Sequence, residues 1–144
     1  MTVRKILNLK GSDVVTIAPE KKLLDAIALL AKQRIGALIV TGKKNEVLGI
    51  LSERDIVHLL SNKDSNRFEK PVSSAMTSAV KTCNPGDPIQ HIMQVMTTGR
   101  FRHMPVVENG TLAGVISIGD VVKLRLEEME RESEHLKEYI ATAK

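Results

Sequence analysis

The chain has 144 residues and a formal net charge of +4, and 42% of its residues are hydrophobic. This length and balance fit a soluble globular protein with one domain or two small repeats, and the basic charge suits an anionic ligand or a nucleic acid. The single cysteine, Cys83, excludes an intramolecular disulfide and a thiolate metal cluster. No apolar run approaches the ~20 residues that span a bilayer, and the first residues lack a signal-peptide core. We therefore expect a cytoplasmic protein with no membrane contact.

The first half of the chain predicts the order β-α-β-β-α. A β-branched stretch is followed by a helix with one apolar face that ends before Gly36, then by two strands joined by a tight turn, and by a helix that begins near Ser52. The expected strands cover 14–17, 37–40 and 47–51. Polar residues broken by Pro71 come next, which is typical of a linker.

The second half predicts the same order again. Asp87 is suited to cap its first helix, Pro88 to occupy the first helical position and Gly99 to end it. Asn109-Gly110 indicates a type I′ hairpin turn, and a further helix begins near Ser117. The expected strands cover 80–82, 104–107 and 112–116.

Residue matches between the halves indicate an internal duplication. In one constant register the matched pairs include Thr16 with Thr82, Pro19 with Pro85, and Val40 with Val106. Further along, in a register shifted by a single position, they include Gly49 with Gly114, Ser52 with Ser117, and Asp55 with Asp120. The register changes within a hairpin turn, where insertions are tolerated. An ordered series of matches broken once at a turn is strong evidence for two repeats.

The C-terminal residues predict a helix with a narrow apolar seam. The seam positions alternate in steps of four and three residues: Val122, Leu126, Met129, Ser133, Leu136 and Ile140. This is heptad spacing, which favours a coiled coil, but Ser133 in the seam and the short length leave a second possibility. In that alternative the helix packs back onto its own domain.

The duplicated unit resembles the CBS motif pair, or Bateman module, first noticed in cystathionine β-synthase. The resemblance lies in Gly49–Asp55 and Gly114–Asp120 after each second hairpin, and in Arg102–Val107, which is similar to the second strand of the family. It implies an α/β fold of two pseudo-symmetric β-α-β-β-α motifs packed through their sheets, plus a C-terminal helix. The implied boundaries are 1–62 for motif 1, 63–78 for the linker, 79–126 for motif 2 and 127–144 for the helical tail.

The resemblance also implies a ligand and a role. Members of the family bind AMP, ATP, S-adenosylmethionine or dinucleotides in the cleft between the two motifs, and usually act as energy or redox sensors. We therefore expect a regulatory module that binds AMP or another adenosine nucleotide (ATP, ADP or NAD(H)), without a metal and without catalysis. Homodimers through the helical faces are common in the family, so the expected partners are a second copy and an unidentified regulated protein.

The two Ser-x-x-Asp sequences are the strongest candidates for ligand contacts. Ser52 with Asp55, and Ser117 with Asp120, stand where a strand meets a helix. A carboxylate there can accept hydrogen bonds from both ribose hydroxyls, and the helix N-terminus with the serine hydroxyl favours phosphate. The same pattern is also a capping box. The family assigns the Asp to ribose and the Ser to ribose or phosphate, and the cap can coexist in the unliganded state.

Further candidates come from the resemblance and from the chemistry of phosphate. The adenine positions implied by the family are Thr16, Ile17, Ala37, Lys81, Thr82 and Met104. Arg102 and His103 are suited to phosphate, and the strand that follows them leads to Ser117 and Asp120, so we expect them to serve the second site. The resemblance also implies that this region approaches the pseudo-twofold axis, where one basic group can serve either site. The two sites are unequal, because Arg54 could bring a cation to the first and Gly119 could allow a close approach in the second.

Three other functions compete with nucleotide sensing. A nucleic-acid-binding protein could use the basic cluster 100–103, but aromatic residues make up only 2% of the chain and base stacking needs several. A small nucleotide-using enzyme is not supported, because the sequence contains neither a Gly-x-Gly-x-x-Gly nor a P-loop. A scaffold with an empty cleft is the last alternative.

Overall fold

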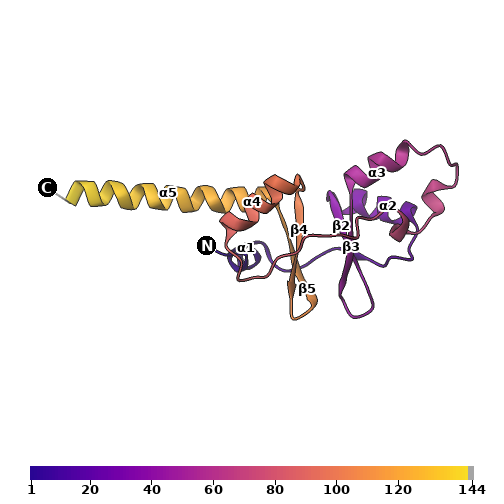
Figure 1. The fold of residues 1–144 in the computed structure, drawn as a ribbon, viewed down its shortest axis with the longest axis horizontal. Coiled ribbons are helices and arrows are strands. Elements are labelled where there is room, and N and C mark those ends of the chain that lie inside the picture. The colour runs from indigo at the N-terminus through magenta and orange to yellow at the C-terminus, as the bar shows by residue number, and fades with distance from the viewer. Residues whose placement is uncertain (143–144) are drawn as a thin grey trace.

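The structure is a computed structural model that describes residues 1–142. Figure 1 shows two halves side by side whose hairpins point the same way. The first half contains β1 (Thr16–Ile17), α2 (Leu23–Gln33), β2 (Ala37–Thr41), β3 (Val47–Ser52) and α3 (Glu53–Leu60). The second contains α4 (Ile89–Gly99), β4 (His103–Glu108), β5 (Thr111–Ser117) and α5 (Ile118–Thr142). A helix α1 (Val3–Lys10) precedes both, and the linker carries short 3-10 helices at Arg67–Glu69 and Val72–Ser74. The expected α/β class with two similar motifs is confirmed.

The first half forms a three-stranded sheet in the order β1-β2-β3. β1 runs parallel to β2, and β2 pairs with β3 in antiparallel fashion, with Ala37 opposite Ser52. The middle of β2 is apolar on both faces because Leu38, Ile39 and Val40 are all buried. The register brings the end of β3 and the start of β2 to the same edge of the sheet, where α3 begins.

The second sheet contains two strands, β4 and β5, because the strand expected over 80–82 does not form. Thr77 is bridged to Ile50 of the first half, and Cys83 is bridged to Val106 of the second. The residues between them must cross from one half to the other, so pairing with β4 is confined to Cys83. Burial raises the pKa of the Cys83 thiol to about 12, as fits a small core residue rather than a nucleophile.

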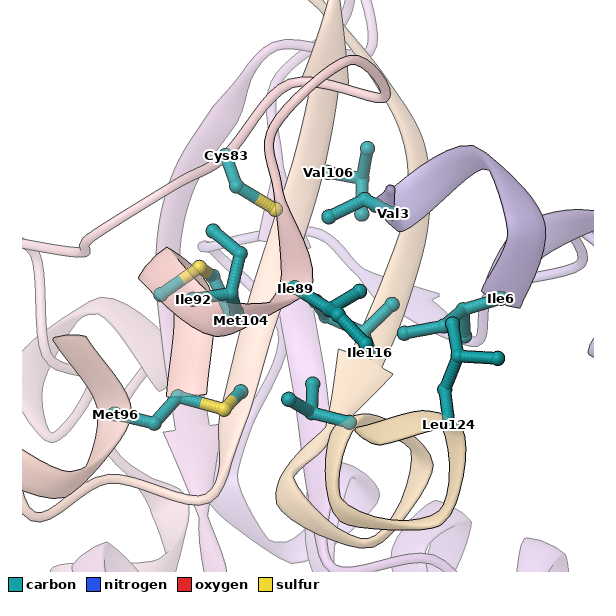
Figure 2. Close-up of a cluster of buried hydrophobic side chains, with 11 residues drawn as sticks. Val3, Ile6, Cys83, Ile89, Ile92, Met96, Met104, Val106, Ile116 and Leu124 are labelled. Atoms are coloured by element: carbon teal, nitrogen blue, oxygen red, sulfur yellow. The ribbon is translucent and has the colours of Figure 1, made fainter. Parts of the chain in front are cut away.

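The helix α1 packs into the second half, although it precedes the first in sequence. Val3 and Ile6 are buried among side chains of α4, β4, β5 and α5, as Figure 2 shows. Val72 of the linker is likewise fully buried in the core of the first half. Each core therefore includes a segment from outside its own expected motif. The helix α1 falls within the boundaries 1–62 expected for motif 1 but completes the second half, and the linker expected over 63–78 completes the first half.

Local signals set most helix ends and turns, with one correction at the start of α4. α4 begins at Ile89, one residue later than expected, with Pro88 at its N-cap, while the Asp87 carboxylate accepts a hydrogen bond from the Asn84 backbone N–H (2.9 Å). α4 ends at Gly99, as expected, and Arg100 (φ 57°) follows it as the left-handed C-cap. The expected hairpin turn is confirmed, because Asn109 and Gly110 both have positive φ.

The second helix of motif 2 and the tail form one continuous helix, α5, which extends away from the rest of the protein in Figure 1. Val121 and Leu124 are buried, but residues 129–142 are exposed. The alternative in which the tail packs back onto its own domain is therefore wrong for this part, and residues 143–144 of the expected tail lie outside the described residues. Among residues 1–142, no helix is both long and apolar enough to cross a bilayer.

Candidate functional site

A cavity of about 440 Å³ lies between the two halves. One wall is the junction of β3 and α3 in the first half, and the opposite wall is the turn from α4 into β4 in the second. A third wall is the segment that crosses between the halves. The lining residues are Gly36, Ile50, Ser52, Glu53, Arg54, Asp55, Thr77, Ala79, Val80, Lys81, Gly99, Arg100, Phe101, Arg102 and His103.

The first Ser-x-x-Asp lines this cavity and forms a complete capping box. The Ser52 side chain accepts from the Asp55 N–H at 3.4 Å, and Asp55 Oδ2 accepts from the Ser52 N–H at 2.8 Å and from its hydroxyl at 3.1 Å. The carboxylate is held in place because it closes the first turn of α3. Within residues 1–142, both hydrogen bonds to the carboxylate end on Oδ2, so Oδ1 remains to accept from a ligand.

Arg102 and His103 line the wall opposite Asp55. The sequence argument assigned them to the second site, but the structure places them in the cavity with the first Ser-x-x-Asp, while His103 also pairs with Ser117 across the β4–β5 ladder. A Cβ atom built on Gly36 would lie 3.4 Å from the His103 ring, so the imidazole rests directly against the first half. These residues sit where both halves meet.

The charge of the cavity is mixed, with cations concentrated on the second half. Burial lowers the pKa of His103, although the Glu53 carboxylate acts in the opposite direction. The imidazole is therefore mainly neutral at pH 7, with one ring nitrogen donating and the other accepting. Arg102 is exposed to the cavity, and the Arg54 guanidinium lies 3.5 Å from the Arg100 carbonyl oxygen. An anionic group in the cavity therefore has Arg54 and Arg102 among its neighbours, as well as Asp55.

The crossing segment supplies residues that the sequence analysis did not identify. Thr77 is held to β3 by two backbone hydrogen bonds with Ile50, each 2.9 Å, and Ala79 and Val80 follow along the cavity wall. Phe101 adds an aromatic face from the other side. The sequence bears no local signal for this role, because Thr77 and Ala79 are exposed and Val80 is only partly buried.

The second Ser-x-x-Asp lies outside this cavity and has another partner. Asp120 Oδ2 accepts from the Ser117 N–H at 2.9 Å and also from the Lys10 ammonium at 2.8 Å. Burial of the Asp120 carboxyl acts to raise its pKa, but the hydrogen bonds from Lys10 and Ser117 outweigh it and hold the pKa below its usual value. The two matched motifs thus differ in charge environment.

The remaining expected site residues do not line the cavity. Thr16 and Ile17 pair with β2, and Met104 is 1% exposed within the second core. A Cβ atom built on Gly119 would be in ordinary van der Waals contact with Ser117 Oγ at 3.6 Å. The cavity therefore unites Ser52, Arg54, Asp55, Lys81, Arg102 and His103. The other expected site residues lie outside its lining: Thr16, Ile17, Ala37, Thr82, Met104, Ser117, Gly119 and Asp120.

Comparisons with known proteins agree with this architecture. The family model of the CBS domain matches residues 3–62 and 72–127. An uncharacterized 17.7 kDa protein of Acidianus ambivalens is 31% identical over 124 residues, covering 85% of this chain and 74% of that protein.

Solved structures of CBS-domain proteins are also similar to this chain. The CBS-domain containing protein ATU1752 from Agrobacterium tumefaciens is 45% identical with a TM-score of 0.82, covering 87% of this chain and 99% of that one. The structure of CBSX2 in complex with AMP has a TM-score of 0.76 at 23% identity, over 89% of this chain and 98% of that one. The chain belongs to the CBS-domain family and contains two CBS repeats.

Proposed function

We propose that this protein is a regulatory module that binds AMP, or a related adenosine nucleotide, in the cavity between its two CBS repeats and performs no catalysis. The carrying observation is that one cavity holds the Asp55 carboxylate on one wall and Arg102 with His103 on the other. The structural neighbour CBSX2, which has the same fold, was solved in complex with AMP. ATP, ADP and NAD(H) share the adenosine group and are the other candidate ligands.

The three chemical parts of AMP match different walls of the cavity. The ribose hydroxyls donate to Asp55, whose Oδ1 is free to accept, and the phosphate lies toward Arg102 and His103. The base packs against the apolar groups of Ile50, Val80 and Phe101. Because the basic cluster 100–103 lies within a cavity between the halves, it suits a small anion better than a nucleic acid strand.

Adenosine nucleotides are expected to raise the melting temperature more than guanosine nucleotides. A ligand that binds only the folded state stabilises it by about 2.7 kcal/mol at a hundredfold excess over its Kd. For a chain of this size that corresponds to a shift on the order of 5–10 °C. Guanine gains less because its extra carbonyl and amine groups would remain without partners against an apolar wall. Thermal denaturation with millimolar AMP, ATP, NADH and S-adenosylmethionine, and with GMP as the control, measures the effect; no shift with any of the adenosine compounds would refute the proposal.

We also propose that the protein is a homodimer and that α5 forms part of the interface as a coiled coil. The seam side chains Leu136 and Ile140 are 60% and 63% exposed, and the end of α5 has no support from the rest of the described chain. An isolated helix as short as the exposed part of α5, residues 129–142, is marginal in water. A second copy that covers the seam would stabilise it. Leu24 on α2 and Val57 on α3 are also exposed and offer a second apolar surface on the body.

Ultracentrifugation at micromolar concentration is expected to give twice the 15.9 kDa chain mass. Leu136→Glu places a charge in the seam and should weaken the dimer at least tenfold, because a charged group would be buried without a partner. Arg131→Glu, on the face of α5 opposite the seam, is the matched control and should leave the dimer unchanged. A monomer in the wild type would reject the dimer, and a dimer unchanged by Leu136→Glu or by deletion of residues 127–144 would reject the role of α5.

A further inference from the structure

The helix α1 and the end of the linker occupy equivalent places in the two halves. Val3 of α1 and Val72 of the linker are each fully buried in the core that their segment completes. The segments also contact the matched glycines of the two repeats: Leu7 lies against Gly114, and Met76 lies against Gly49. Val3 with Val72 and Leu7 with Met76 are in the same register. Three residues beyond these contacts come Lys10, the last residue of α1, and Ala79, which lines the cavity, although only the first of these two segments is helical at this point.

The residue at this equivalent position decides what each Ser-x-x-Asp encounters. Asp55 receives its hydrogen bonds from the neutral donors of Ser52, and the nearby Ala79 brings no charge. Asp120 instead forms an ion pair with the Lys10 ammonium at 2.8 Å. Lys10 also donates to the Val115 carbonyl oxygen at 3.2 Å, so its ammonium is held at two points beside β5.

We infer that Lys10 occupies the second nucleoside site and limits the protein to one nucleotide per chain. This inference rests on the proposed function for the meaning of the Ser-x-x-Asp carboxylates. The bonds to Asp120 end on Oδ2, as they do at Asp55, but one of the donors here is the Lys10 ammonium. A ribose that donates to both carboxylate oxygens would have to displace this charged donor with a neutral hydroxyl, which forms a weaker hydrogen bond with a carboxylate. At Asp55 the ribose meets no such competitor from the corresponding position.

The inference gives Lys10 a role in ligand stoichiometry that a helix-end lysine would not otherwise have. Lys10 is exposed, so removing its charge is not expected to disturb the cores that Val3 and Ile6 complete. Lys10→Met keeps the length of the side chain and removes the ammonium. Lys5 is an exposed lysine on the same helix, and Lys5→Met is the matched control.

Equilibrium dialysis with AMP measures the number of sites in each variant. The wild type and Lys5→Met are expected to bind one AMP per chain, and Lys10→Met is expected to bind two. Adding Asp120→Ala to Lys10→Met should return the number to one through loss of the gained site. Adding Asp55→Ala to Lys10→Met should also leave one, now the second site.

The outcomes separate the inference from the proposed function. If Lys10→Met binds no more AMP than the wild type, or if the wild type already binds two, the role of Lys10 is wrong. If the wild type binds none but Lys10→Met gains a site that Asp120→Ala abolishes, the inference stands and the proposed first site is wrong. If no variant binds AMP, both are wrong.

Discussion

Asp55→Ala is expected to weaken the binding of AMP about ten- to a hundredfold. The carboxylate accepts from the ribose, and a hydrogen bond to a charged group contributes about 1.5–3 kcal/mol. Because AMP and adenosine share the ribose, titration calorimetry should show the same loss with both ligands. Asp55 also closes the capping box of α3, so the substitution should lower the free energy of unfolding by about 1 kcal/mol.

Arg102→Ala provides the contrast that separates ribose from phosphate. It should weaken the binding of AMP and leave the affinity for adenosine nearly unchanged, because adenosine carries no phosphate for the guanidinium to bind. Arg102 lies opposite Asp55 in the same cavity, so both variants report on one site. If Asp55→Ala binds AMP normally and merely melts earlier, the carboxylate acts as a helix cap and has no role in binding.

Gly49→Ala is expected to cause a large loss of both stability and AMP affinity. A Cβ atom at Gly49 would lie 2.7 Å from the Thr77 carbonyl oxygen and 2.8 Å from Met76 Sδ, distances that require the chain to move. The movement would break the two hydrogen bonds between Ile50 and Thr77 that hold the crossing segment to β3. We expect a loss of about 2–4 kcal/mol from overpacking together with the broken backbone pair.

The matched control for Gly49→Ala is Gly114→Ala in the second repeat. There the nearest atom to a built Cβ is the end of the flexible Leu7 side chain, which can move without breaking a backbone pair. Urea denaturation should therefore show a smaller loss for Gly114→Ala, and AMP titration should show no loss of affinity at the first site. Equal effects of the two substitutions in both measurements would contradict the role assigned to the crossing segment.

Features with a local cause were predictable from the sequence. The β-α-β-β-α order of the first half and the α-β-β-α order of the second follow from hydrophobic periodicity, and the turn at Asn109-Gly110 follows from the positive φ that these residues tolerate. The spacing of Ser52 and Asp55 also allows a capping box beside the favoured role in ligand binding, and the structure contains this box. In each case the relevant contacts lie within a few residues along the chain.

Features that depend on contacts between distant segments were not predictable in this way. The sequence analysis predicts no helix over 3–10, and the burial of Val3 and Ile6 in the second core depends on contacts with segments far away in the chain. The loss of the strand expected over 80–82 follows from the separate anchors of Thr77 and Cys83 in different halves. The same crossing brings Lys81 to the cavity, while the turn after α4 brings Arg102 and His103 to the first Ser-x-x-Asp.

Chemical-shift mapping of AMP binding by NMR tests the central claim most directly, since a 15.9 kDa chain gives resolvable backbone amide signals. Titration of the labelled protein with AMP should produce saturable shifts concentrated at Ser52, Asp55, Lys81 and His103, which meet at the cavity between the repeats. The amide of Ser117, whose partner carboxylate is paired with Lys10, should shift less. An absence of saturable shifts at millimolar AMP, or shifts gathered on a surface away from this cavity, would contradict the account.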